Sequence, residues 1–157
     1  MEITNLEQEE LFVSGEGGYH TYRIPALAVT TEGIVLAFCE GRLDSSSDSG
    51  QIDLLLRRSD DGGHTWSATQ VIVTEADMTC GNPCPVVDRN TGTIWLPFCH
   101  DNDRVFMTHS DDDGKNWSKP VEITSSVKDD NWGWYATGPG HGIQIERGKH
   151  AGRLVVP

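Results

Sequence analysis

The residues that could do chemistry lie in one short stretch, between positions 22 and 53. Arg23 precedes an apolar run, Arg42 follows the next one, and a serine-rich loop then carries Asp44 and Asp48. Arginine suits a carboxylate-binding site because its planar guanidinium donates two parallel hydrogen bonds and stays charged. An aspartic acid beside it suits general acid catalysis when its pKa is raised toward the working pH. The stretch therefore predicts a site that binds an anionic group and donates a proton.

The same residues also have an ordinary explanation. Arginines at strand ends are usually solvated or salt-bridged, and Ser, Asp and Gly dominate hairpin loops for conformational reasons alone. However, the two apolar runs at 24–29 and 34–38 are separated by a turn signal at 30–33. Antiparallel pairing of these runs brings Arg23, near the start of one strand, close to Arg42, past the end of the next.

A repeated pattern of strand and turn must position this stretch. Strands are expected at 52–58 and 105–109, and they lead into the boxes SDDGGHTW and SDDDGKNW. In each box the aspartate can accept backbone hydrogen bonds, the glycine can take a positive φ, and the tryptophan can pack under the turn. The boxes align residue for residue: Ser59, Asp61, Gly63, Thr65 and Trp66 with Ser110, Asp112, Gly114, Asn116 and Trp117.

Further short strands are expected after the boxes, at 70–74 and 121–124, and helical periodicity is absent. Short strands with turn signals that recur about every 50 residues indicate β-propeller blades of four strands each. The sequence therefore predicts an all-β chain with an N-terminal lead over residues 1–18 and one domain over residues 19–157.

The amino-acid composition limits the classes of partner that this chain can bind. With 12 Lys+Arg against 24 Asp+Glu, the formal net charge of -12 argues against nucleic acid and anionic membrane surfaces. No apolar run approaches the roughly 18 residues of a transmembrane segment, and the acidic N-terminus lacks the features of a signal peptide. A cytoplasmic location is expected if Met1 is the true start, and a lysosomal or secreted one if it is not.

No metal or other cofactor is expected. The cysteines and histidines match no zinc spacing, so four buried free thiols are expected: Cys39, Cys80, Cys84 and Cys99. A calcium-binding repeat is suggested by the aspartates at 111–113 before Gly114. The alternating ligands and terminal glutamate of a calcium loop are missing, however, and the turn accounts for the same aspartates.

The boxes at 59–66 and 110–117 resemble the Asp boxes of the sialidase (neuraminidase) superfamily. YRIP at 22–25 is similar to the motif that supplies the first catalytic arginine of that family. Other pieces match it too: CEGR at 39–42, GNPCP at 81–85 and ATGPGHGIQ at 136–144. The resemblance covers nearly the whole chain from Tyr19 onward. It implies that residues 19–157 form roughly half of a six-bladed sialidase β-propeller.

In activity, the resemblance implies an exo-α-sialidase, a glycoside hydrolase that releases terminal sialic acid from sialylated glycans with retention. In that family three arginines hold the substrate carboxylate, an aspartic acid is the acid/base, and a tyrosine paired with a glutamate is the nucleophile. Most other retaining glycosidases use a carboxylate nucleophile. The family's tyrosine, glutamate and two further clamp arginines would belong to later blades, so this chain alone is expected to be inactive.

Residue by residue, Arg23 matches the first clamp arginine. Arg42 matches an arginine that contacts the substrate near its carboxylate and ring hydroxyls, and Glu40 matches the acid that orients an arginine. Asp48 matches the acid/base because it keeps the family's distance to the arginines before the first box. Asp44 is the alternative.

Two interpretations stay open for the remaining motifs. Asn82 matches a residue that lines the pocket for the N-acetyl group, or it serves a structural turn. The aromatic residues Trp132, Trp134 and Tyr135 could flank the leaving group, or they could pack in the core or at the rim. For the whole chain, the alternative function is a non-catalytic Asp-box propeller that binds glycans or proteins.

Overall fold

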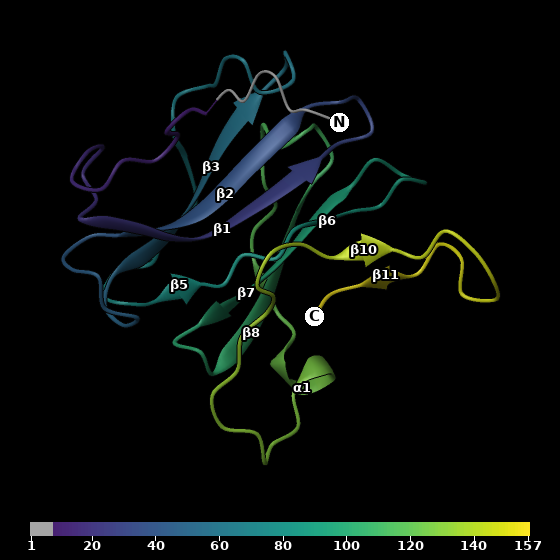
Figure 1. Cartoon of the computed structure of the whole chain (residues 1–157). Helices are drawn as coiled ribbons and strands as arrows, with labels where there is room; N and C mark the ends of the chain where they lie inside the picture. The colour runs from purple at the N-terminus through teal and green to yellow at the C-terminus, as the bar shows by residue number, and fades with distance from the viewer. Residues whose placement is uncertain (1–7) are drawn as a thin grey trace, which may run out of the picture.

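Three antiparallel sheets build the molecule, as the computed structural model of residues 8–157 shows (Figure 1). Residues 1–7 of the expected lead lie outside the described residues. The prediction of an all-β chain is confirmed. Among residues 8–157, no helix has the length and apolar character needed to span a bilayer.

The first sheet contains the stretch with the candidate site. Its strands lie in the order β1 (Thr21–Val29), β2 (Val35–Arg42), β3 (Ile52–Ser59) and β4 (Gln70–Val73). The two central strands are buried over most of their length. The expected turn between β1 and β2 is confirmed: the backbone N–H of Thr30 donates to the carbonyl of Ile34 at 3.0 Å, and Gly33 takes a φ of 84°.

The second sheet repeats this plan, except that two short strands take the place of one long first strand. It contains β5 (Cys80–Gly81), β6 (Val86–Val87), β7 (Ile94–His100), β8 (Arg104–Ser110) and β9 (Val121–Glu122). β5 and β6 both pair with β7, and β8 and β9 follow on its other side. A two-stranded sheet, β10 (Ile143–Gln144) with β11 (Leu154–Val155), ends the chain.

One sequence expectation was too long: the strand predicted at 121–124 ends at Glu122. A four-residue helix, α1 (Thr124–Val127), follows it. The reason is local, because the hydroxyl of Thr124 accepts the backbone N–H of Val105 at 2.9 Å. The side chain thus replaces the backbone partner that a longer strand would have supplied.

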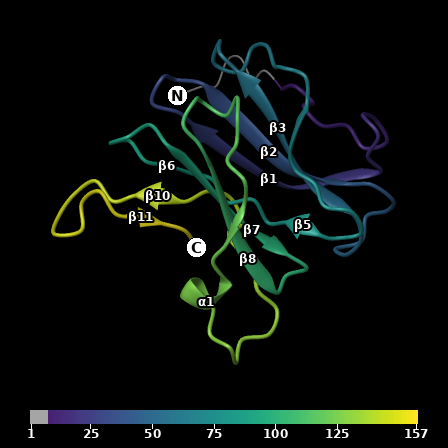
Figure 2. The ribbon, with the colours of Figure 1, turned by 180° about the vertical axis from the view of Figure 1, so that it is seen from behind.

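The main core lies where the first two sheets pack face to face. Its buried side chains come from both sheets: Ala26, Leu36, Phe38, Leu56, Ile94 and Leu96. Viewed from behind, the long strands of each sheet run between two ends of the molecule (Figure 2). At one end β1 and β3 begin and β2 finishes, and we call it the site end. At the other, β3 and β8 run into the two boxes, and we call it the box end.

Candidate functional site

Arg23 lies on a distorted part of β1. The pairing of β1 with β2 is regular up to Arg23 and resumes at Ala26, and Ile24 between them has a φ of 53°. Positive φ is unusual for a β-branched residue, and such strain is found mainly where a side chain must be aimed for function. The guanidinium of Arg23, about half exposed, donates from Nη1 to Oδ1 of Asp48 at 2.7 Å.

Arg42 and Glu40 form a buried ion pair at the end of β2. Both side chains are 3% exposed, and Nε and Nη2 of Arg42 donate to Oε2 of Glu40 at 3.1 and 2.7 Å. The pairing follows from the strand, since alternate residues share one face of a sheet. Desolvation opposes the charge of Arg42, but hydrogen bonds to Glu40 and Asp48 outweigh it and raise the pKa of the guanidinium.

The loop that joins β2 to β3, residues 43–51, we call the acid loop. Nη1 of Arg42 reaches into it and donates to the carbonyls of Ser46 and Ser47 at 2.7 Å each and to Oδ1 of Asp48 at 2.8 Å. Two arginines thus converge on one carboxylate oxygen. Asp44 lies exposed on the same loop, and the ion pairs of Arg23 and Arg42 go to Asp48 instead.

The electrostatics of Asp48 differ from what a ready general acid needs. The hydrogen bond from Arg42, then the charges of Arg42 and Arg23, lower the pKa of this carboxyl group below its ordinary value. Desolvation opposes them, but it is a smaller effect than the hydrogen bond and the charge of Arg42, and the side chain is 78% exposed. Asp48 is therefore an ionised carboxylate in this state, and it cannot donate a proton until the arginines release it.

Asn82 contacts the same buried glutamate from the second sheet. Its backbone N–H donates to Oε1 of Glu40 at 2.9 Å, and its carbonyl accepts the hydroxyl of Thr137 at 2.6 Å. Its φ of 58° fits the structural-turn interpretation. Glu40 therefore joins Arg42 of the first sheet to Asn82 of the second, although 42 residues separate Glu40 from Asn82.

Tyr19 and Asp53 form a support that the sequence analysis missed. The phenol of Tyr19 donates to Oδ2 of buried Asp53 at 2.8 Å. A Cβ at Gly41 would lie 2.7 Å from the Tyr19 ring and 2.5 Å from Cδ1 of Leu55, so only glycine fits between Glu40 and Arg42. The glycine of CEGR was the available sequence signal, and it marks close packing beneath β2.

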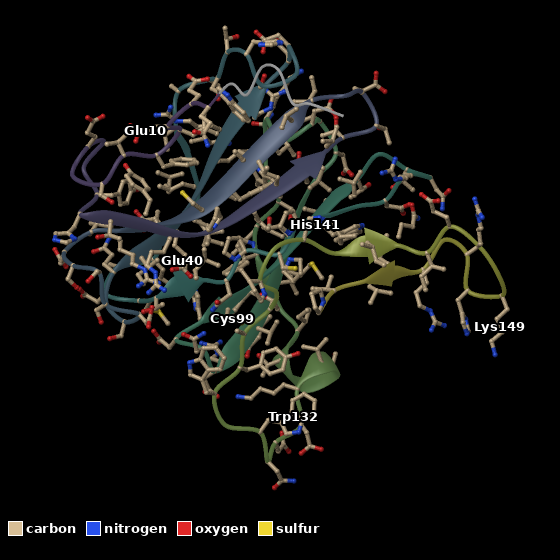
Figure 3. All side chains as sticks on the ribbon, in the orientation of Figure 1. Glu10, Glu40, Cys99, Trp132, His141 and Lys149 are labelled. Carbon is tan, nitrogen blue, oxygen red and sulfur yellow. The ribbon has the colours of Figure 1, made fainter. Side chains whose placement is uncertain are left out.

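The aromatic residues after α1 lie on an exposed rim. Trp132 and Trp134 are 54% and 75% exposed, so the core interpretation was wrong for them. Trp132 stacks on Tyr135 with ring centroids 5.9 Å apart. Figure 3 shows Trp132 on the loop beyond α1, well apart from Glu40. Within residues 8–157, the structure therefore does not place Trp132 beside the buried glutamate of the site.

The Asp boxes lie at the box end, and their serines and aspartates close their own turns. Oδ1 of Asp61 accepts the hydroxyl of Ser59 at 2.8 Å and the backbone N–H of Thr65 at 2.8 Å. Oδ2 accepts the Thr65 hydroxyl at 2.6 Å. These bonds, with the Thr65 hydroxyl contributing most, hold the pKa of Asp61 well below its ordinary value. The turn predicted for each box is confirmed.

The second box shows the same bonding, with Asn116 in place of Thr65. The backbone N–H and side-chain amide of Asn116 donate to Asp112 at 2.8 and 2.7 Å, and the Ser110 hydroxyl donates at 2.9 Å. Both Asp112 oxygens therefore serve the turn, which explains the aspartate without calcium. Across residues 8–157, no three His, Cys, Asp or Glu side chains are grouped as metal ligands.

The four cysteines are buried free thiols, as predicted: Cys39, Cys80, Cys84 and Cys99. Burial raises the pKa of the Cys84 thiol to about 11 and, with the nearby charge of Glu40, that of Cys39 to about 12. They are therefore protonated at neutral pH and are poor nucleophiles or metal ligands.

Comparisons with known proteins agree on one family. The family model described as "BNR repeat-like domain" matches residues 33–157. An exo-alpha-sialidase of Aspergillus fumigatus is 33% identical over 89% of this chain and 41% of its own length. The chain thus spans less than half of that relative.

Solved structures give the same result for the fold. The Hadza microbial sialidase Hz136 superposes with a TM-score of 0.76 and 31% identity, over 84% of this chain and 32% of that one. The leech intramolecular trans-sialidase, solved with 2,7-anhydro-Neu5Ac, superposes with a TM-score of 0.84 over 98% of this chain and 42% of that one. At 16% identity, the leech protein bears on the fold alone.

Proposed function

The chain belongs to the sialidase superfamily, and from this we propose that it contributes the acid and two arginines of an exo-α-sialidase site. The substrates proposed are sialylated glycans, and the reaction is the release of terminal sialic acid with retention. One observation carries the proposal: Nη1 of Arg23 and Nη1 of Arg42 both donate to one carboxylate oxygen of Asp48. A pair of guanidinium groups placed in this way is suited to hold the carboxylate of sialic acid.

In this mechanism Asp48 occupies the arginines until a substrate arrives. The substrate carboxylate competes with Asp48 for the hydrogen bonds of Arg23 and Arg42. Once those bonds pass to the substrate, the chief cause of the lowered pKa of Asp48 is removed, and the carboxyl group can take up a proton. It then donates that proton to the leaving oxygen as a general acid.

The buried glutamate has a positioning role in the same proposal. Glu40 fixes Arg42 through Nε and Nη2, which leaves Nη1 to face the acid loop. Its other oxygen fixes the backbone of Asn82, the proposed N-acetyl contact. The nucleophile and further carboxylate-binding groups are not among the roles proposed for this chain, so turnover by residues 1–157 alone is not expected.

The test measures fluorophore release from an aryl α-sialoside, and release from a natural sialoside, by the protein expressed from the entire reading frame. We expect Arg23→Ala to lower turnover of both substrates by about 100-fold or more, because a group that binds the substrate is lost. Asp48→Ala should lower turnover of the natural sialoside by about 100- to 10,000-fold, since its poor leaving group needs a proton.

The matched control is Arg104→Ala. Arg104 is also half exposed and also paired with a carboxylate, that of Glu122, but it lies outside the proposed site. Its loss should leave both rates unchanged. Absence of release by the unaltered protein would contradict the proposal and favour a glycan-binding propeller without catalysis.

A further inference from the structure

Thr79 holds the acid loop from the second sheet. Its hydroxyl donates to the carbonyl of Gly50 at 2.9 Å and accepts the backbone N–H of the same residue at 3.2 Å. Thr79 is only 5% exposed, whereas Gly50 is exposed and has a φ of 120°. A buried side chain therefore satisfies both backbone groups of an exposed loop residue.

The backbone of Thr79 is itself fixed on both sides. Its N–H donates to Oδ1 of Asp101 at 3.1 Å, and its carbonyl accepts the Asp101 N–H at 3.0 Å. On the other side it forms a parallel bridge with Ile52, the first residue of β3. The hydroxyl is thus presented from a rigid junction between the first and second sheets.

Three side chains from outside the acid loop hydrogen-bond to it in the part of the chain that the structure describes: Arg23, Arg42 and Thr79. Both arginines bind the carboxylate of Asp48, so a bound anionic substrate competes with the loop for them. Thr79 carries no charge, and within the acid loop it hydrogen-bonds only to the backbone of Gly50. Of these three side chains, it is therefore the anchor that an anionic substrate does not compete for.

We propose that Thr79 is a positioning residue, which keeps Asp48 at the leaving group after the substrate has taken over the arginines. This inference rests on the proposed function, because it assigns a role within the same reaction. Without the hydroxyl, the end of the loop at Gly50 loses both of its fixed hydrogen bonds. Asp48 then spends less time against Arg23 and Arg42 before binding, and less time at the leaving group afterwards.

The first test is an NMR titration of the Asp48 carboxyl group in this chain, and it needs no catalysis. Thr79→Val removes the hydroxyl and keeps the shape, so the pKa of Asp48 should move up toward the value of an ordinary aspartate. Thr79→Ser retains the hydroxyl and should restore the titration. Thr108→Val is the matched control, since Thr108 is equally buried and donates to the Ser118 carbonyl at 2.7 Å, far from the loop.

An unchanged Asp48 titration in folded Thr79→Val would overturn the inference. Should that variant fail to fold, Thr79→Ala removes the hydroxyl without placing a methyl group against Gly50 and provides the same test. Movement of Asp48 in Thr108→Val as well would equally count against a specific role for Thr79.

The second test is kinetic and uses the protein from the entire reading frame. We expect Thr79→Val to lower kcat/KM for a natural sialoside about tenfold, because a misplaced acid slows the step that needs it. For the aryl sialoside, kcat/KM should change less than about twofold, because its leaving group departs without a proton from the acid. Equal losses on both substrates would show a merely structural role. Absence of release by the unaltered protein would contradict the proposed function, while the titration would still decide the role of Thr79 in the loop.

Discussion

The acid loop and the first Asp box lie at the two ends of β3, and each contains two aspartates. In both, a hydrogen-bonded aspartate has a lowered pKa, but the donors differ. Asp61 is held by Ser59, His64 and Thr65 within its own turn. Asp48 is held by guanidinium groups from β1 and β2. The box is thus a local structure, whereas the site depends on how the strands and sheets are assembled.

The comparison predicts the largest loss of stability when the buried glutamate at the site end is removed. Glu40→Ala leaves the 3% exposed guanidinium of Arg42 without its main partner. Removing one partner of a buried ion pair is strongly destabilising, so we expect a loss of about 3–5 kcal/mol in the free energy of unfolding. Urea unfolding of this chain measures it.

The matched control is Glu122→Ala, which breaks the exposed pair with Arg104. Exposed ion pairs contribute little, and the unfolding midpoint should stay close to that of the unaltered chain. Equal losses in the free energy of unfolding would mean that the buried ion pair at the site end stabilises the chain no more than an exposed one does.

The next largest effect is a difference in stability between variants of the two boxes, because their tryptophans make different contacts. Trp117 packs edge-on against Phe38 of the first sheet, with centroids 5.9 Å apart, whereas Trp66 donates from Nε1 to the Gly63 carbonyl of its own turn at 3.0 Å. We expect Trp117→Ala to destabilise the chain by about 3 kcal/mol, because it opens the packing between sheets. Trp66→Ala should cost roughly half as much, since that ring serves its own turn.

Substitution with phenylalanine should reverse the order of the two stability losses. The buried Nε1 of Trp117 has no hydrogen-bond partner among residues 8–157, so Trp117→Phe removes an unsatisfied group. Trp66→Phe loses a hydrogen bond, which is typically worth about 1 kcal/mol. If thermal unfolding ranks the two tryptophans in the same order for both substitutions, their contacts are not what distinguishes the boxes.

Contacts could be predicted from the sequence where the partners are near one another in the chain. The boxes could be predicted because Ser59, Asp61 and Thr65 satisfy one another within a single turn. The resemblance gave Glu40 only as an acid that orients an arginine, and its pairing with Arg42 is also local, since alternate residues of one strand share a face. The bounds of the strands that were predicted were close, and the error at 121–124 came from one side-chain hydroxyl, that of Thr124, which replaced a strand partner.

The parts that could not be predicted depend on contacts between sheets. No local pattern indicates that Thr79 meets Gly50 or that the Asn82 backbone meets Glu40, because those contacts exist only after the sheets have packed. The same holds for the lowered pKa of Asp48: the proposed general-acid role favours a raised value, but two arginines from separate strands set the opposite direction. The motifs therefore indicated candidate site residues, whereas the direction of the pKa shift of Asp48 depends on how the strands are assembled.

The smallest effect, a shift in titration with salt, tests the comparison most directly. The pKa of Asp48 is lowered by arginines and is sensitive to screening, because the carboxylate is 78% exposed. That of Asp61 is lowered by neutral hydroxyl and backbone donors. Raising the ionic strength from about 0.01 M to about 1 M shortens the Debye length from about 30 Å to about 3 Å. We therefore expect the pKa of Asp48 to rise with salt and that of Asp61 to stay nearly fixed in an NMR titration.

The sign of the matching stability effect follows from the direction of both shifts. A carboxyl group whose folded pKa is lowered contributes stability above its unfolded pKa, and the contribution is lost as the pH falls through the folded value. Salt should thus reduce the contribution of Asp48 to stability at neutral pH and leave that of Asp61 unchanged. Asp48→Asn should remove the salt dependence of this part of the acid unfolding curve, whereas Asp61→Asn should leave it in place. Equal salt shifts at the two aspartates would mean that remote arginines are not what sets the charge of the acid loop.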